Sequence, residues 1–316
     1  MRKILCFGGC HVDRIAHAGE PIVPGSSNPV GITRSFGGVA RNVAESLTRL
    51  GGDCRLVSRV GSDADGNAVT AHLEKLGVDT AVSRSPTQPT ATYHALLAPD
   101  GDLFVAFADM GVYDEIDAAA IDAGLQSTGA AGVAGPADQG DIWFIDGNLP
   151  AAALEHLLKR KPADVLVTAD AVSVAKSQRI KPHLDAVDIL FANGDEAEAM
   201  TGLAKTRDDF AATACRQLSV LGAGAIVLTR GPAGVSVMQV DRLEHQAALP
   251  ADICNSTGAG DALIAGTLAG LGRGMDLFAG ARLGQACAAM ALESEVSVPK
   301  TLTLQAAMAR AGLRQG

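Results

Sequence analysis

The chain has few aromatic residues and no excess of basic ones. The first shortage limits which side chains can form the core, and the second argues against a nucleic-acid partner. Aromatic residues make up 3% of the 316 residues and hydrophobic residues 47%, so Ala, Val, Leu and Ile must build the core. The 26 lysines and arginines are outnumbered by 35 acidic residues, which gives a formal net charge of −9. Because basic residues supply much of the affinity for nucleic acids, a nucleic acid is not an expected partner.

Paired cysteines and long apolar runs are also missing. The six cysteines are scattered and none forms a CxxC pair, which argues against a zinc site. The first residues, MRKILCFGG, lack the longer apolar run of a signal peptide, and no segment reaches the length that spans a bilayer. We therefore expect a cytoplasmic protein with reduced thiols and no membrane partner.

Strand-like and helix-like patterns alternate along most of the chain. Apolar strands are expected at DIWFID, VLVTAD, DILFAN and AIVLTR, separated by amphipathic helices such as PAAALEHLLKR and FAATACRQLSVLG. Two Ala-rich helices are expected over roughly 258–293. The alternation predicts an α/β fold with a mostly parallel central sheet, helices on both faces, and ligands beyond the carboxyl ends of the strands.

Two N-terminal pieces do not fit this alternation. Residues around 10–36 and 90–107 are strand-rich, and the second piece is typical of a hairpin with its turn at Pro99-Asp100-Gly101. Within the first piece, residues 20–36 are rich in Pro, Gly and Ser and are expected to be irregular. We expect the two pieces to form a small separate sheet, a lid over the site. Residues 117–141 are expected to form a helix and a loose connection.

The stretch NSTGAGDALIAG, residues 255–266, places three small residues and an acid before an apolar helical pattern. Free backbone N–H groups at a helix N-terminus can bind an anion, and missing side chains let a phosphate approach them closely. Asp261 would stand beside that anion, where a carboxylate can orient a hydroxyl and accept its proton. A plain glycine turn with an acid in the first helical turn explains the same spacing about equally well.

Two other glycine-rich motifs are absent. A dinucleotide fingerprint needs GxGxxG after the first strand, but that strand runs into GGCHVD. The phosphate-binding pattern GxxxxGK[ST] does not occur either. These absences argue against a nicotinamide-dependent oxidoreductase and against a P-loop nucleoside triphosphatase.

TGAGD followed by an Ala- and Gly-rich helix resembles the signature of the ribokinase-like (PfkB) carbohydrate and nucleoside kinases. Four other segments resemble motifs of that family in the expected order: CHVD (10–13), GGVARNVA (37–44), NGDE (193–196) and TRGPAG (229–234). The matches extend from residue 10 to residue 266. The resemblance therefore implies a single ribokinase-like kinase domain over residues 1–316.

The resemblance implies a role for each matched residue. Asp261 would be the catalytic base, beside an anion hole for the γ-phosphate of ATP formed by Gly258, Ala259 and Gly260. Asn193 and Glu196 would organise Mg²⁺, largely through water, although a solvated helix face is the alternative for Glu196. The remaining matched residues would contact the nucleotide (Asn193, Thr229, Arg230, Gly231, Gly234) or the hydroxyls of the acceptor (Asp13, Gly37, Gly38, Asn42).

One departure from the family pattern concerns a monovalent cation. The family signature usually begins with Asp-Thr, and this chain has Asn255 and Ser256 instead. The family's Asp contributes to a monovalent-cation site in many members. Asn255 keeps an oxygen but loses the charge, so the sequence leaves activation by K⁺ open.

Shorter segments resemble a narrower group within the family, the pseudouridine kinases: SSNP (26–29), ADM (108–110), DGN (146–148) and DAVS (170–173), the last followed by Lys176. They add four residues expected to contact the nucleoside: Asn28, Asp109, Asn148 and Asp170. The implied reaction transfers phosphate from ATP to the 5′-hydroxyl of pseudouridine.

Alternatives stay open at this stage. A PfkB kinase of a free sugar or another nucleoside, such as ribose, fructose or adenosine, differs only in the acceptor pocket. A non-catalytic sugar or nucleotide sensor is a further alternative, against which the intact Asp261 argues. Because the edges of a small lid sheet could pair between subunits, we also expect a homodimer through the lid.

Overall fold

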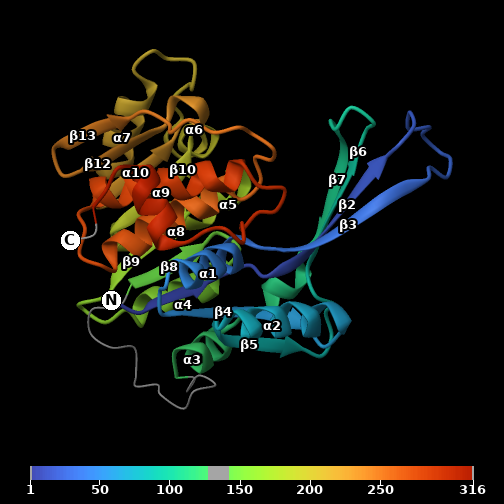
Figure 1. Ribbon diagram of the computed structural model, residues 1–316. Coiled ribbons are helices and arrows are strands. Elements are labelled where there is room, and N and C mark those ends of the chain that lie inside the picture. Colours follow the sequence, from blue (N-terminus) through green and yellow to red (C-terminus); the bar gives the residue numbers. More distant parts are fainter. Residues whose placement is uncertain (1, 127–141, 315–316) are drawn as a thin grey trace.

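The computed structural model describes residues 2–126 and 142–314, whose strands form one large and one small sheet (Figure 1). Within these ranges, none of the helices combines the length and apolar character that a membrane span requires. The helix expected near the start of 117–141 is present as α3 (Ala118–Gln126). The loose connection expected after it falls on residues 127–141, outside the described residues.

The large sheet has nine strands in the order β13-β12-β11-β10-β9-β8-β1-β4-β5. Neighbouring strands from β11 to β5 pair in parallel, and only β12 and β13 run antiparallel to their neighbours. This confirms the mostly parallel sheet expected from the alternating pattern. The strands are β1 (Ile4–Phe7), β4 (Cys54–Gly61), β5 (Asp79–Ser85), β8 (Ile142–Asp146), β9 (Leu166–Asp170), β10 (Ile189–Asn193), β11 (Ala225–Thr229), β12 (Val235–Gln239) and β13 (Arg242–Gln246).

Helices cover both faces of the large sheet, because successive side chains of each buried strand point to opposite faces. In β1, Ile4 and Cys6 pack on one side, and Leu5 and Phe7 pack on the other. The first face is covered by α1 (Val39–Arg49), α2 (Ala64–Leu76), α8 (Ala259–Leu271), α9 (Leu277–Leu292) and α10 (Leu304–Ala311). The second face is covered by α3, α4 (Ala151–Lys159), α5 (Val174–Ile180), α6 (Gly194–Thr201) and α7 (Phe210–Val220).

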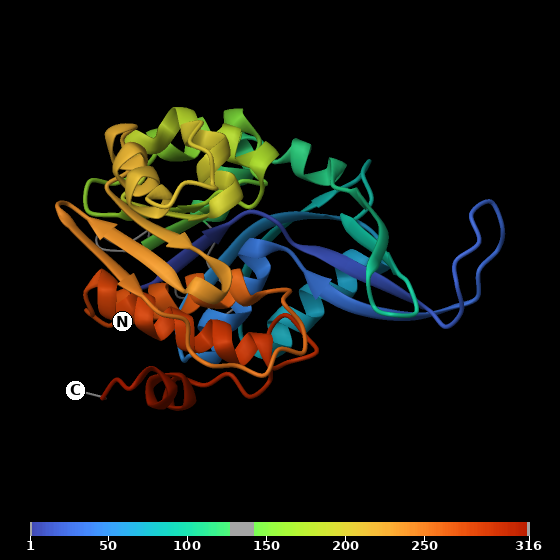
Figure 2. The same cartoon turned by 90° about the horizontal axis from the view of Figure 1, so that it is seen from above.

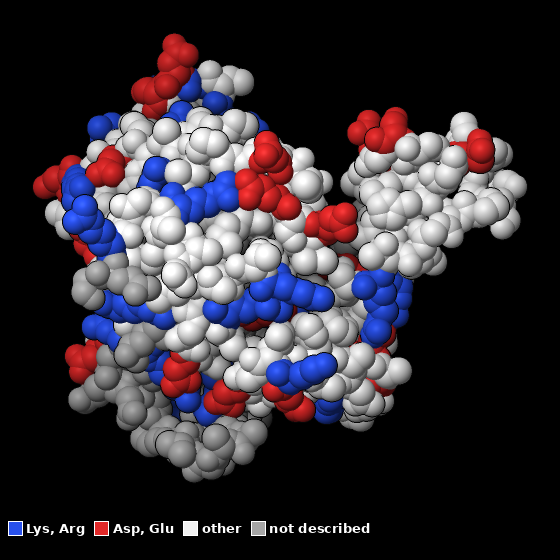
Figure 3. Space-filling model, in the orientation of Figure 1, with Lys and Arg blue, Asp and Glu red and all other residues white. Residues whose placement is uncertain are grey.

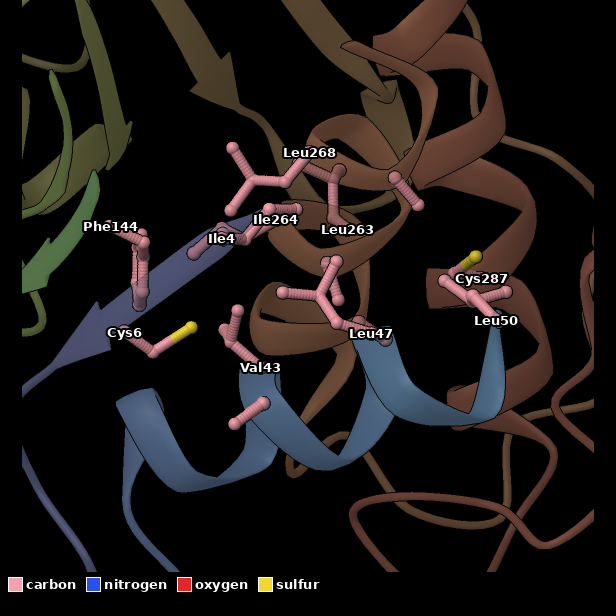
Figure 4. Close-up of a cluster of buried hydrophobic side chains, with 14 of the residues drawn as sticks. Ile4, Cys6, Val43, Leu47, Leu50, Phe144, Leu263, Ile264, Leu268 and Cys287 are labelled. Carbon is pink, nitrogen blue, oxygen red and sulfur yellow. The ribbon is translucent and has the colours of Figure 1, made fainter. Parts of the chain in front are cut away.

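The packing of α1 against α8 and the sheet brings the N-terminal and C-terminal parts of the chain together. Val43 and Leu47 of α1, and Leu50, which follows the helix, are fully buried, and their spacing places them on one face. They lie with Leu263 and Leu268 of α8 in one cluster over β1 (Figure 4). Most of this core is aliphatic, as the low aromatic content requires.

The small sheet has four strands in the order β3-β2-β6-β7, and we call it the lid sheet. It projects away from the body of the protein (Figures 1 and 2). Its strands are β2 (His11–Ala18), β3 (Val30–Gly37), β6 (Thr92–Leu97) and β7 (Leu103–Asp109). The separate sheet and the hairpin β6–β7 are as expected. The irregular stretch expected at 20–36 is wrong for its second half, because residues 30–36 pair with β2.

Candidate active site

Four adjacent strands of the large sheet each end in a polar residue. Asp146 ends β8, Asp170 ends β9, Asn193 ends β10 and Thr229 ends β11. The parallel register places Asp146 beside Asp170, and Asn193 beside Thr229. The carboxyl ends of parallel strands meet at one edge, so residues that are far apart in the sequence gather there.

The turn before α8 leaves room for an anion. Gly258 precedes the helix with φ 83°, and a Cβ at this position would lie 2.5 Å from the carbonyl oxygen of Ser297. Gly260 is exposed, and a Cβ there would meet no atom of the described residues within 4 Å. Nor does any side chain in the described ranges cap the start of α8. The first amides of the helix therefore border open space, which fits an approaching phosphate group.

Asp261 lies in the first turn of α8 and is partly buried. The side-chain amide of Asn42 donates a hydrogen bond to its Oδ2 atom over 2.7 Å. Burial raises the pKa of Asp261 from 3.8 to about 6, although the bond from Asn42 opposes this shift. A carboxylate whose pKa lies near working pH is suited to accept a proton from a hydroxyl.

Asp13 faces the same region from the lid sheet. His11 Nε2 lies 3.1 Å from Asp13 Oδ1, and His11 Nδ1 lies 3.1 Å from the hydroxyl of Tyr113. A Cβ at Gly37 would lie 2.3 Å from a carboxylate oxygen of Asp13, so only glycine fits beside this group. Gly38, with φ 104°, then starts α1, which carries Asn42. The structure thus brings together four residues expected at the acceptor: Asp13, Gly37, Gly38 and Asn42.

Asp146 is a residue that sequence reasoning missed. Its fully buried carboxylate accepts hydrogen bonds from the backbone N–H groups of Gly9 and Ala40, each over 2.9 Å, and from that of Asn148 over 2.8 Å. It ties the end of β1, the start of α1 and the loop after β8 together. The available signal was an acid closing the otherwise apolar strand IWFID.

Asn148 and Asp170 lie in the same region. Lys176 Nζ donates to Asn148 Oδ1 over 2.5 Å, and Asn148 is buried. Burial raises the pKa of Asp170 well above its usual value, and the negative charges of Glu196, Asp261 and Asp146 raise it further. Burial also lowers the pKa of Lys176, an effect that the charge of Asp146 opposes.

Asn193 and Glu196 form a capping box at the start of α6. Asn193 Oδ1 accepts from the N–H of Glu196 over 3.0 Å, and Glu196 Oε2 accepts from the N–H of Asn193 over 2.8 Å. Glu196 is only 4% exposed, so its alternative interpretation as a solvated helix face is wrong. Burial raises its pKa. The carboxylate and amide oxygens of this pair are of the ligand type that Mg²⁺ prefers, and they can also accept hydrogen bonds from the waters that Mg²⁺ retains.

The motif TRGPAG forms the turn between β11 and β12. The hydroxyl of Thr229 donates to the carbonyl of Ala192 over 3.4 Å, and the N–H of Arg230 donates to the carbonyl of Gly234 over 2.8 Å. Gly231 and Gly234 adopt φ values of 54° and 85°. Thr229 thus lies beside Asn193 at the sheet edge, and the Arg230 side chain is exposed.

Two expected acceptor residues lie apart from this group. Asn28 lies in the loop between β2 and β3, at the far end of the lid sheet, and its side chain bonds to the backbone of Val23 and Ser26. Asp109 is exposed at the end of β7, and its Oδ1 accepts from the N–H of Gly111 over 3.3 Å. The structure does not bring either side chain to Asp261.

Known proteins resemble the chain over most of its length. It is 29% identical over 301 residues to pseudouridine kinase of Escherichia coli strain K12, covering 92% of this chain and 91% of that protein. It is 28% identical over 254 residues to fructokinase of Klebsiella pneumoniae, covering 74% and 76% of the two chains.

Solved structures share the fold. A carbohydrate kinase from Agrobacterium tumefaciens aligns with a TM-score of 0.82 and 31% identity, over 99% of this chain and 98% of that one. Ribokinase from Thermotoga maritima aligns with a TM-score of 0.83 and 21% identity, over 99% and 100%. Residues 1–301 match the family described as pfkB family carbohydrate kinase. The chain therefore belongs to this family of phosphotransferases, which act on hydroxyl groups of sugars or nucleosides.

Proposed function

We propose that the chain transfers the γ-phosphate of ATP to the 5′-hydroxyl of pseudouridine, giving pseudouridine 5′-phosphate and ADP. The observation that best supports a kinase activity is the contact of Asn42 with Asp261, which joins the expected acceptor site to the glycine turn before α8. Support for pseudouridine comes from the 29% identity, over 92% of the chain, to a pseudouridine kinase. The buried polar residues Asp146, at the end of β8, and Asn148, just after it, add groups that can position a nucleoside.

In this proposal the γ-phosphate of ATP lies against the first amides of α8, at Gly258, Ala259 and Gly260. The 5′-oxygen of the acceptor attacks phosphorus in line while Asp261 accepts its proton. The new P–O bond forms as the bond to the β–γ bridging oxygen breaks, and ADP leaves. Fixed amides stabilise the charge of the transferring group because they need no reorganisation during the reaction.

The nucleotide would extend from this point toward β11 and β12, along Thr229, Arg230, Gly231 and Gly234. Asn193 and Glu196 would hold Mg²⁺ through water. When bound, Mg²⁺ supplies positive charge that offsets the charge developing on the phosphates. Because Asn255 lacks the charge of the family's aspartate, we expect little activation by K⁺.

The ribose hydroxyls would contact Asp13, Gly37, Gly38 and Asn42, and the base would face Asn148 and Asp170. A carboxylate such as Asp13 accepts two neighbouring hydroxyl donors, which suits a ribose. Closure of the lid sheet over the acceptor would exclude water and so suppress hydrolysis of ATP. In that closed state Asn28 and Asp109 are the candidates that would have to move toward the nucleoside.

The lid sheet also supports a homodimer, with a second copy of the chain as the partner. Every residue of its edge strand β7 is exposed, including Leu103, Phe104 and Phe107. Figure 3 shows that this projection carries few charged side chains on the face in view. An exposed apolar edge of this kind favours pairing with another chain. Phe104→Glu should convert a dimer into a monomer in sedimentation experiments, and a wild-type monomer would refute the dimer.

The free cysteines and the proposed reaction support a cytoplasmic location. All six cysteines are free thiols, and five of them are buried. We place the protein in the cytoplasm, where thiols stay reduced and ATP is available.

A kinase of a free sugar or another nucleoside is the second candidate. The observation that favours it is the 28% identity to fructokinase, which is close to the value for pseudouridine kinase. The same catalytic groups serve either acceptor. A non-catalytic sensor is disfavoured, because the family consists of phosphotransferases and Asp261 lies at the anion-binding turn.

The test is ADP release from Mg-ATP across pseudouridine, uridine, adenosine, ribose and fructose, with Asp261→Asn as the control for contaminating enzymes. Selective turnover of pseudouridine, with phosphate on its 5′-oxygen by NMR, is the expected result. Turnover of a sugar instead would support a kinase activity and refute pseudouridine as the acceptor. No turnover in the whole panel by a protein that binds ATP would refute all five acceptors.

A further inference from the structure

Arg41 is a buried cation that contacts the acceptor side of the site without lying in it. Only 3% of the residue is exposed. Its Nη1 atom donates to the carbonyl of Phe36 over 2.9 Å and to Asn42 Oδ1 over 2.7 Å. Its Nη2 atom donates to the carboxylate of Glu45, one turn further along α1. The guanidinium therefore bridges the end of the lid strand β3, the side chain of Asn42 and the interior of α1.

This contact fixes which end of the Asn42 amide faces Asp261. An asparagine amide has an oxygen that accepts and an NH₂ group that donates, and either could point to a given neighbour. A guanidinium only donates, so the atom of Asn42 facing Arg41 must be the oxygen. The NH₂ group then faces Asp261 and donates over 2.7 Å. Turning the amide over would set donor against donor and oxygen against carboxylate.

Glu45 anchors the guanidinium from the other side. The residue is 2% exposed, and its carboxylate accepts from Arg49 Nη2 over 2.7 Å and lies 3.3 Å from His72 Nε2. A buried arginine without such a partner would be costly. Because Glu45 keeps Arg49 and His72 as partners, a change at Arg41 does not leave its carboxylate unpaired.

We propose that Arg41 is a positioning residue for phosphoryl transfer: anchored by Glu45, it holds the Asn42 amide in the orientation that donates to Asp261. The inference rests on the proposed kinase activity, in which Asp261 is the base. Arg41 does not contact the reacting atoms in this scheme. Through Asn42 it determines the orientation of the Asp261 carboxylate and how readily that carboxylate ionises.

Several charged groups near Asp261 shift its pKa in opposite directions. The charge of Asp146 at the end of β8 disfavours the ionised form of Asp261. Asp170 at the end of β9 is a second acid nearby, and its own pKa is raised by the charge of Asp261. The bond from Asn42 and the charges of His11 and Arg41 favour ionisation. Without the donated bond, burial and the acids would act with less opposition, so the pKa of Asp261 would rise.

The test compares kcat/KM as a function of pH in wild type, Arg41→Lys, Asn42→Ala and the double variant. Lysine keeps the positive charge but cannot hold Asn42, Phe36 and Glu45 with a rigid fork. We expect Arg41→Lys to reduce kcat/KM at pH 6 by roughly threefold to tenfold more than at pH 8. In the Asn42→Ala background the same change should add little, because the residue through which Arg41 acts is gone.

Arg49→Lys is the matched control. Arg49 shares the Glu45 carboxylate with Arg41 and does not contact Asn42. It should alter thermal stability to a similar extent and leave the pH profile unchanged. Should Arg41→Lys fail to fold, Glu45→Gln weakens the anchor and should move the profile in the same direction.

A measurement without turnover separates this inference from the proposed function. The ¹³C carboxyl resonance of Asp261, assigned through Asp261→Asn, should titrate at higher pH in Arg41→Lys than in wild type. That shift would support the positioning role even if no acceptor in the panel reacted. An unchanged titration of Asp261 in a folded Arg41→Lys protein, or additive effects of Arg41→Lys and Asn42→Ala, would overturn it.

Discussion

The side-chain amide of Asn42 donates a hydrogen bond to the carboxylate of Asp261 over 2.7 Å, although the two residues are 219 positions apart. Asn42 lies on α1, which continues directly from the lid strand β3. Asp261 lies on α8, directly after the glycine turn that borders open space. The contact therefore couples the place where an acceptor would bind to the place where a phosphate would bind.

Asp261→Asn should remove most turnover and yet make the protein more stable. The folded protein holds the Asp261 proton more tightly than the unfolded chain, because its pKa is raised from 3.8 to about 6. Ionisation above pH 6 therefore costs the folded state up to about 3 kcal/mol, and asparagine avoids this cost. Urea unfolding at pH 8 should show a gain of about 1–3 kcal/mol, with ATP affinity within about threefold of wild type. Near-normal kcat would contradict the role of Asp261 as base.

The pH dependence of the wild-type enzyme should reflect the same carboxylate. A base must be ionised, so kcat/KM, which reports the pKa of the free enzyme, should fall as the pH drops through about 6 and reach a plateau above about 7. Values of kcat/KM between pH 5 and 9 measure this acid limb. An acid limb near pH 4, the usual range of an exposed aspartate, would mean that Asp261 is not buried as described or is not the base.

Gly258 and Gly260 should respond in opposite ways to an added side chain. Gly260→Val should fold without a large loss of stability, because valine has a slightly higher helix propensity than glycine, but it should obstruct the phosphate. We expect at least a hundredfold lower kcat/KM for this variant. Gly258→Ala should instead lose stability, because of its φ of 83° and the nearby oxygen of Ser297. Thermal unfolding and kinetics of both variants, side by side, test the assignment.

Asp146→Asn should weaken both stability and acceptor binding. The carboxylate accepts three backbone N–H bonds, and an asparagine would turn its NH₂ group toward at least one of those donors. A buried donor without a partner costs about 1–3 kcal/mol. Because Asp146 holds the start of α1, KM for the acceptor should rise more than KM for ATP. Asp188→Asn, which removes the charge that pairs with Lys161 and weakens the acceptor for the Val167 N–H at the opposite end of the sheet, should lower stability only.

Glu196→Gln should raise the Mg²⁺ concentration needed for activity. Glutamine can still bond to the N–H of Asn193, so the capping box and α6 should persist. The lost charge weakens attraction for the hydrated cation. Activity titrated with Mg²⁺ should show a half-maximal concentration at least severalfold higher, with an unchanged circular dichroism spectrum. An unchanged Mg²⁺ requirement would remove Glu196 from the metal site.

The sequence by itself determined the sheet and the composition of the core. Runs such as IWFI and ILFA are apolar throughout, because strands buried on both faces have no polar side. The hairpin β6–β7 followed from its Pro-Asp-Gly turn. The irregular interpretation of residues 30–36 failed because most of the Pro, Gly and Ser residues that suggested a loop lie at 21–29. Val30, Ile32 and Phe36 instead alternate on one face of β3, which pairs with β2.

The motif around Asp261 could also be predicted, since small residues before a helix leave backbone amides free whatever surrounds them. Asp146 and Arg41 could not be predicted in the same way. A lone acid after a strand and a lone arginine on a helix have many possible partners, and local pattern does not choose among them. Only the folded chain brings Gly9 and Ala40 to Asp146, and only the packing of α1 buries the Arg41–Glu45 pair and places Asn42 against Asp261. Burial then gives these contacts their strength, because polar groups removed from water must find partners within the protein.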